Sequence, residues 1–141
     1  MEIREITGTE TERVFAAMRE LHPRLTSREL FLEAVERTRA DGYRIVASFS
    51  DGDDDAAAVA GFRLGESFAW GRYLYLEDLA TRESRRRQGH AGALMTWLVS
   101  EARRTRCEQI HLDSRVVRYG SHRFYLNHGM RIGGYHFDRH L

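Results

Sequence analysis

The chain has 141 residues, which is enough for one domain. Hydrophobic residues make up 42% and charged residues 30%, with 22 basic against 21 acidic side chains and a net charge of +1. This balance excludes an intrinsically disordered chain and argues against nucleic-acid binding through bulk charge. Every basic residue is Arg, so no Schiff-base or P-loop lysine exists. We expect a single domain over residues 1–141.

Two further protein classes are excluded by single features. Cys107 is the only cysteine, so neither an internal disulfide nor a cysteine-based zinc cluster can form. The longest apolar run, residues 56–60, is far shorter than the ~20 residues that span a bilayer, and residues 1–7 lack an apolar signal core. We therefore expect a soluble cytoplasmic protein that does not associate with membranes.

In chain order, the first half changes from helical to strand periodicity. A weakly alternating strand is predicted at 2–7, followed by two helices, the first from Thr9 or Thr11 to about Leu21 and the second from Ser27 to Gly42. His22-Pro23 ends the first helix. Alternation then predicts strands at 43–49 and 56–64, joined by an acidic turn at 51–55 that we interpret as a solvated hairpin tip.

The second half predicts a strand at 73–81, a basic loop, and a helix whose apolar face runs from Ala91 to Ala102. A short strand at 107–114 and a helix at 121–127 follow, and the tail has two extended pieces around Gly133-Gly134. Hairpins and crossover helices alternate, which predicts an α+β fold with a mixed sheet.

The segment 85–92, between a strand and an amphipathic helix, has the composition of an anion cradle. Small residues at positions 89, 91 and 92 allow an anion to approach the unpaired N–H groups of a helix N-terminus, and arginines add charge-assisted contacts. No GK[ST] or G-x-G-x-x-G pattern is present. A glycine-assisted tight turn with solvated arginines is the alternative interpretation of the segment taken alone.

Two motifs in register resemble those of the GNAT superfamily of acetyltransferases. Arg86-x-x-Gly89-x-Ala91 is similar to the R/Q-x-x-G-x-G/A signature that opens a helix after a strand. The segment 124–130, FYLNHGM, looks like the F/L-Y-x-x-x-G-F/M motif downstream. The resemblance covers nearly the whole chain and implies a mostly antiparallel central sheet that splays between its fourth and fifth strands, flanked by about four helices.

The same resemblance implies an acyltransferase that uses acetyl-CoA as co-substrate and a primary amine of a small molecule or a protein as acceptor, without a metal. The backbone of Leu79, Ala80 and Thr81 would pair with the pantetheine arm. The pyrophosphate would lie on the segment made of Arg86, Arg87, Gln88, Gly89, His90, Ala91 and Gly92. A phosphate contact is one interpretation of the His90 side chain; a loop side chain without a role is the other.

For the chemistry, Tyr125 matches the tyrosine of the family that protonates the leaving thiolate. The base is left open between Glu77, Asp113, and other groups or none. Strand alternation predicts that Glu77 points the same way as Leu79, and that Asp78 points the opposite way unless a bulge intervenes. A backbone N–H near Leu79 is the implied oxyanion donor.

The chain departs from the family pattern at Arg118, where many members carry an asparagine that contacts the cofactor. Two other functions stay open: a non-catalytic acyl-CoA-binding or regulatory domain, and a nucleic-acid module built on the arginines at 82–87, which the balanced charge disfavours. His136 and His140 have H-x₃-H spacing without a third ligand, so a metal is not expected. A homodimer is possible by analogy with the family.

Overall fold

The computed structural model describes all residues, 1–141, as two compact units. The first unit comprises Met1–His111 and the second Leu112–Leu141, and each is described by itself. The expectation of one domain over the whole chain stays a prediction.

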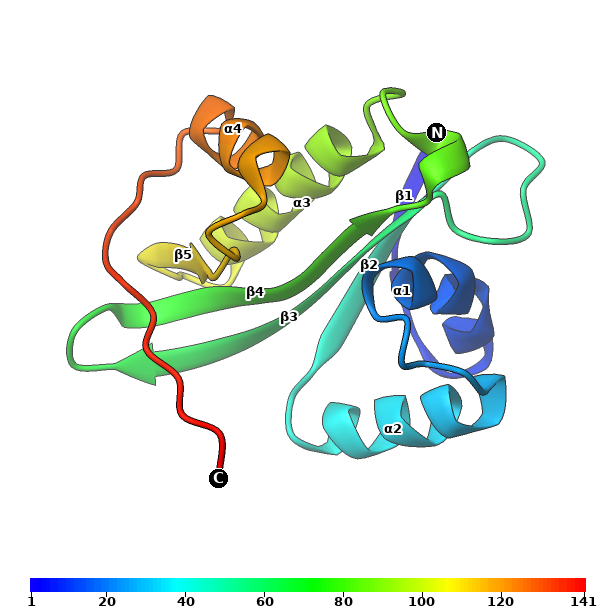
Figure 1. Cartoon of the computed structure of the whole chain (residues 1–141), viewed down its shortest axis with the longest axis horizontal. Helices are drawn as coiled ribbons and strands as arrows, with labels where there is room; N and C mark the ends of the chain where they lie inside the picture. Colours follow the sequence, from blue (N-terminus) through cyan, green and yellow to red (C-terminus); the bar gives the residue numbers. More distant parts are fainter. The chain divides into compact units, whose positions relative to one another are not determined.

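A five-stranded sheet in the order β1-β2-β3-β4-β5 forms the centre of the first unit (Figure 1). Its strands are β1 (Glu2–Ile6), β2 (Arg44–Phe49), β3 (Ala58–Ser67), β4 (Gly71–Thr81) and β5 (Gln109–Leu112). The pairs from β1 to β4 are antiparallel, whereas β5 starts beside the start of β4 and runs parallel to it. The predicted mixed, mostly antiparallel sheet is confirmed.

Helices cover both faces of this sheet, as Figure 1 shows. On one face lie the 3-10 helix η1 (Gly8–Val14) and the helices α1 (Phe15–Leu21) and α2 (Arg28–Ala40). The helix α3 (His90–Arg104) lies on the other face and follows a 3-10 turn, η2 (Glu83–Arg85). The predicted start of α2 is confirmed, because the Ser27 hydroxyl accepts the Leu30 N–H at 3.3 Å.

Each face of the sheet has its own apolar core. The face toward α1 and α2 buries a cluster that includes Phe15, Phe31, Ile45, Val59 and Ala80. The opposite face buries Leu94 and Leu98 of α3 and places the Trp97 ring edge-on to Phe62, with centroids 5.9 Å apart. Alternate residues of the central strands therefore enter different cores, which is why these strands are apolar along most of their length.

A β-bulge at Glu77 interrupts this alternation in β4. Gly61 of β3 lies opposite Asp78 and Phe62 lies opposite Leu76, so Glu77 has no partner in the register. Leu74 and Leu76 therefore face α3, whereas Asp78 and Ala80 face α1 and α2. The expectation that Glu77 points the same way as Leu79 is wrong, because the bulge puts Glu77 and Asp78 on one face.

The second unit consists of α4 (Tyr119–Asn127) and the irregular segments around it. The helix ends in a turn whose Gly129 has φ +81°, a conformation that glycine adopts without strain. Residues 130–141 form no strand, so the two extended pieces predicted for the tail pair with nothing in this structure. The alternation around Gly133-Gly134 is compatible with a strand, but a strand also needs a partner edge.

Candidate active site

An unpaired backbone edge runs along the last residues of β4. The Arg82 N–H donates to the Ala57 carbonyl, so by antiparallel alternation Ala80 bonds with Val59 while Leu79 and Thr81 direct their N–H and C=O groups away from β3. β5 has four residues and starts beside Arg72, so at ~3.3 Å per residue it ends short of Leu79. The edge therefore offers backbone N–H and C=O groups to an extended ligand, although the Thr81 carbonyl also accepts a long hydrogen bond from the Arg86 Nε.

The loop that follows this edge leads directly into the N-terminus of α3. Gly89 has φ +89° and caps the helix, and Arg87 also has a positive φ of 62°. The first helical bond runs from the Ala93 N–H to the Gly89 carbonyl, so the N–H groups before residue 93 have no partner within the helix. These groups carry the positive end of the helix dipole, which fits a phosphate.

The arginines of the loop divide into two pairs. Arg82 and Arg85 both contact the Asp53 carboxylate, at 3.4 and 2.7 Å, and tie the acidic hairpin tip to the loop. Asp53 is therefore an ion-pair partner of this loop and not the solvated tip expected from the sequence. Arg86 and Arg87 are exposed, and the Arg86 Nε donates to the Thr81 carbonyl at 3.5 Å. The second pair provides the cations accessible at the cradle.

The side chain of His90 points into the protein and not into the cradle. It is buried between Ser48, which belongs to β2, and Ser50, which follows the strand. Nδ1 lies 2.6 Å from the Ser48 hydroxyl and Nε2 lies 3.1 Å from the Ser50 hydroxyl. Burial lowers the pKa of His90, and the charges of the N-terminus and Arg85 add to the effect. His90 thus anchors the start of α3, and only its backbone is available to a ligand.

Beside the bulge, two acidic side chains of β4 have different partners. Glu77 accepts a hydrogen bond from the Arg63 guanidinium at 2.6 Å. Asp78 is deeper and uses both oxygens: the Tyr43 hydroxyl donates to one at 2.6 Å, and the His22 Nε2 lies 2.6 Å from the other. Neither His22 nor Tyr43 was expected beside Asp78 from the sequence, in which only the break at His22-Pro23 marks that segment.

Tyr125 and Asp113 belong to the second unit. Tyr125 is half-buried on α4, and burial raises the pKa of its phenol while the Arg118 guanidinium opposes the shift. Arg118, the departure from the family pattern, therefore acts electrostatically on Tyr125. Asp113 is exposed and lies 3.3 Å from the His136 Nδ1.

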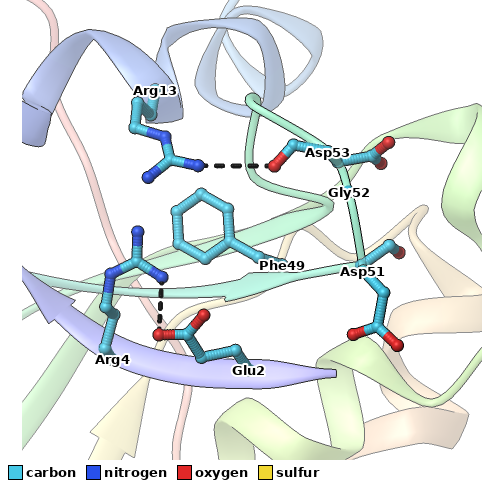
Figure 2. Close-up of a pocket in the computed structure, with 8 residues that line it drawn as sticks. Glu2, Arg4, Arg13, Phe49, Asp51, Gly52 and Asp53 are labelled. Atoms are coloured by element: carbon cyan, nitrogen blue, oxygen red, sulfur yellow. Dashed lines mark hydrogen bonds and ion pairs between the residues drawn. The ribbon is translucent and has the colours of Figure 1, made fainter.

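A separate hollow of about 360 Å³ lies at the N-terminal side of the first unit (Figure 2). The guanidinium groups of Arg4 and Arg13 lie 4.2 and 4.5 Å from the centre of the Phe49 ring. Both guanidinium groups are already paired with Glu10. None of the site residues predicted from the sequence lines this hollow. It lies between β1, η1 and the tip of the β2–β3 hairpin.

Two further features of the chain bear on the class of site. No group of three or more His, Cys, Asp or Glu side chains is arranged to hold a metal ion. None of the helices combines the length and the apolar character needed to cross a bilayer.

Comparison with solved structures places this fold among acetyltransferases. A probable acetyltransferase superposes with a TM-score of 0.83 at 21% identity, over 100% of this chain and 97% of that one. An aminoglycoside N-acetyltransferase in complex with CoA gives 0.83 at 18%, over 99% and 93%. A glucosamine-6-phosphate N-acetyltransferase from Arabidopsis thaliana gives 0.76 at 20%, over 99% and 97%.

The family model described as "Acetyltransferase (GNAT) family" matches residues 7–130. The chain belongs to this family, as its two sequence motifs predicted. A search of the curated proteins finds no match.

Proposed function

We propose that the chain is an N-acetyltransferase that moves the acetyl group of acetyl-CoA to a primary amine of a small molecule or a protein, by direct transfer in a ternary complex. The observation that carries this proposal is the continuity of two binding features. The unpaired edge at Leu79 and Thr81 leads through the loop into the N-terminus of α3. An extended thioester arm fits the edge, and a pyrophosphate fits the helix N-terminus.

In this proposal the backbone of residues 79–81 holds the pantetheine arm, with the Leu79 N–H directed at the thioester oxygen. Ala80 contributes less than its neighbours, because its backbone groups already bond with Val59. The backbone of residues 86–92 holds the pyrophosphate, and the side chains of Arg86 and Arg87 supply cations. Negative charge that develops on the thioester oxygen is then stabilised by an N–H donor that is fixed before the reaction.

Two catalytic roles, an acid and a base, fall to three candidate residues in this proposal. Tyr125 would protonate the departing thiolate; its raised pKa keeps the phenol protonated at neutral pH. Glu77 and Asp113 are the two carboxylates that the sequence offers as acceptors of the amine proton, and the sequence leaves the choice of base open. Glu77 lies at the bulge, next to the proposed thioester site, but the Arg63 guanidinium already occupies one of its oxygens.

Two measurements test this proposal. Calorimetry with acetyl-CoA should give micromolar binding, and a panel of amines should release coenzyme A thiol in the presence of the protein. Binding without release on any amine would favour a non-catalytic acyl-CoA-binding domain. Salt-sensitive binding of DNA or RNA without acetyl-CoA binding would favour the nucleic-acid module, although two of its arginines are paired with Asp53.

A further inference from the structure

We propose that His22 is the group that takes the proton from the acceptor amine, and that Asp78 and Tyr43 hold its imidazole in place. This inference rests on the proposed acetyl transfer. It assigns the step that the sequence left open among Glu77, Asp113 and water to a histidine at the end of α1. Three features of the first unit lead to it.

The first feature is the way Asp78 is aimed. The bulge at Glu77 turns Asp78 toward α1 and α2, opposite Gly61. A Cβ at Gly61 would lie 1.7 Å from the Tyr43 hydroxyl oxygen, so only glycine leaves room for that hydroxyl to reach Asp78. The bulge, Gly61 and Tyr43 together fix the Asp78 carboxylate next to the backbone edge at Leu79.

The second feature is the difference in exposure between the two partners. The Asp78 side chain is 16% exposed and has both oxygens occupied, whereas the His22 side chain is 47% exposed. A carboxylate accepts hydrogen bonds, so the His22 Nε2–H donates to Asp78. In the neutral ring the lone pair then lies on Nδ1. No side chain or backbone group of the chain hydrogen-bonds to that nitrogen. The His22 ring is therefore the more accessible of the two side chains, and Nδ1 is its nitrogen without a partner in the chain.

The third feature is that the backbone holds His22 in one position. Its N–H donates to the Met18 carbonyl at 2.9 Å, and its carbonyl accepts the Leu25 N–H at 2.9 Å. His22 is also the C-cap of α1, so both backbone bonds lie where the helix ends. Asp78 of β4 is the charged group in contact with the His22 ring. Tyr43 contacts the other oxygen of Asp78, and Arg63, which pairs with Glu77, lies over the Tyr43 ring.

The proposed transfer releases one proton to solvent overall. The acceptor arrives as R–NH₃⁺, and the His22 Nδ1 takes one proton and releases it to solvent. The nitrogen lone pair forms the C–N bond while the C–S bond of the thioester breaks. The nitrogen then loses a second proton to solvent through the same imidazole. The thiolate takes a proton from its acid, Tyr125 in the proposed function, and solvent restores the proton of that phenol. The products are R–NH–acetyl, the coenzyme A thiol and one solvent proton.

The test compares His22→Gln with His140→Gln, since His140 is 97% exposed at the far end of the tail. In the presence of an active amine, His22→Gln should lower kcat/KM by about 10²-fold, while the melting temperature and the acetyl-CoA Kd stay at their wild-type values. Its kcat/KM should rise with pH as the amine loses its own proton, and its pH profile should differ from the wild-type profile. His140→Gln should match wild type.

Two positioning variants extend the test. Asp78→Asn and Tyr43→Phe should each lower kcat/KM, Asp78→Asn by about 10-fold or more, because the imidazole loses its fixed tautomer and direction. A wild-type pH profile and rate in His22→Gln, with transfer intact in the wild-type protein, would overturn the inference and leave the proposed function standing. Absence of transfer by the wild-type protein on every amine would overturn both.

Discussion

The side chains singled out by the cradle motif and by the proposals differ in burial. His90 is buried between two hydroxyls and holds the start of α3, so a residue inside the cradle motif is structural. Tyr125 is half-buried on α4 with a raised pKa, which suits a proton donor. His22 is exposed enough to meet a substrate and is held by a carboxylate. Sequence alone does not distinguish these environments, because each depends on contacts with residues far along the chain.

The hydroxyl of Tyr125 is expected to matter for turnover and not for acetyl-CoA binding. Tyr125→Phe removes only the hydroxyl, so we expect kcat to fall by about 10²-fold while the calorimetric Kd for acetyl-CoA changes little. Tyr135→Phe, on the exposed tail, is the matched control and should keep the wild-type kcat. An unchanged kcat in Tyr125→Phe would remove this phenol from the mechanism.

At the scale of elements, periodicity predicted most of the helices and strands. The helix expected from Ala91 to Ala102 is α3, and the alternating runs at 43–49 and 73–81 are β2 and β4. The sequence left a bulge near Glu77 open and could not locate it, because its position depends on how β3 pairs with β4. The Tyr43–Asp78 and His22–Asp78 contacts join residues 35 and 56 positions apart, a separation that local patterns do not detect.

The close approach of β3 to Tyr43 predicts a specific sensitivity. Gly61→Ala should destabilise the fold by about 1–3 kcal/mol, because the added methyl displaces the Tyr43 hydroxyl from Asp78. Urea unfolding followed by tryptophan fluorescence measures the change. Gly120→Ala is the control, since nothing lies within 4 Å of its added Cβ. Equal stability in the two variants would show that Tyr43 does not need this glycine.

An ion-pair network attaches α3 to the sheet and predicts the acid sensitivity of the fold. Hydrogen bonds from Arg104 and Arg44 hold the pKa of the buried Glu101 at about 2. The folded state therefore binds this proton less readily than the unfolded state. Its contribution, on the order of 3 kcal/mol, is fully present above about pH 4.5 and is lost as the pH falls toward 2.

Glu101→Gln should be less stable than wild type at pH 7 and should lose less stability between pH 5 and pH 2. Unfolding free energies measured across that range test this. Glu36→Gln, whose carboxylate is 69% exposed beside Arg39, should follow the wild-type curve. If Glu101→Gln shows the wild-type pH slope, then the network does not set the acid sensitivity.

At the scale of the whole molecule, the sequence motifs led to the correct family and fold class. The tail was the exception: residues 130–141 have a strand-like pattern without a strand. Strand formation depends on a partner edge as well as on alternation, so the pattern alone could not decide the outcome. The two motifs likewise do not identify the acceptor amine, because in the family they concern acetyl-CoA and not the acceptor.

Transfer of label from acetyl-CoA carrying an isotopically labelled acetyl group tests the central claim most directly. With an active amine, we predict that labelled acetyl-amine forms in step with coenzyme A thiol, and that His22→Gln slows both equally. Label that stays on acetyl-CoA, or that appears only as acetate, with every amine tested would contradict the assignment of this chain as an N-acetyltransferase.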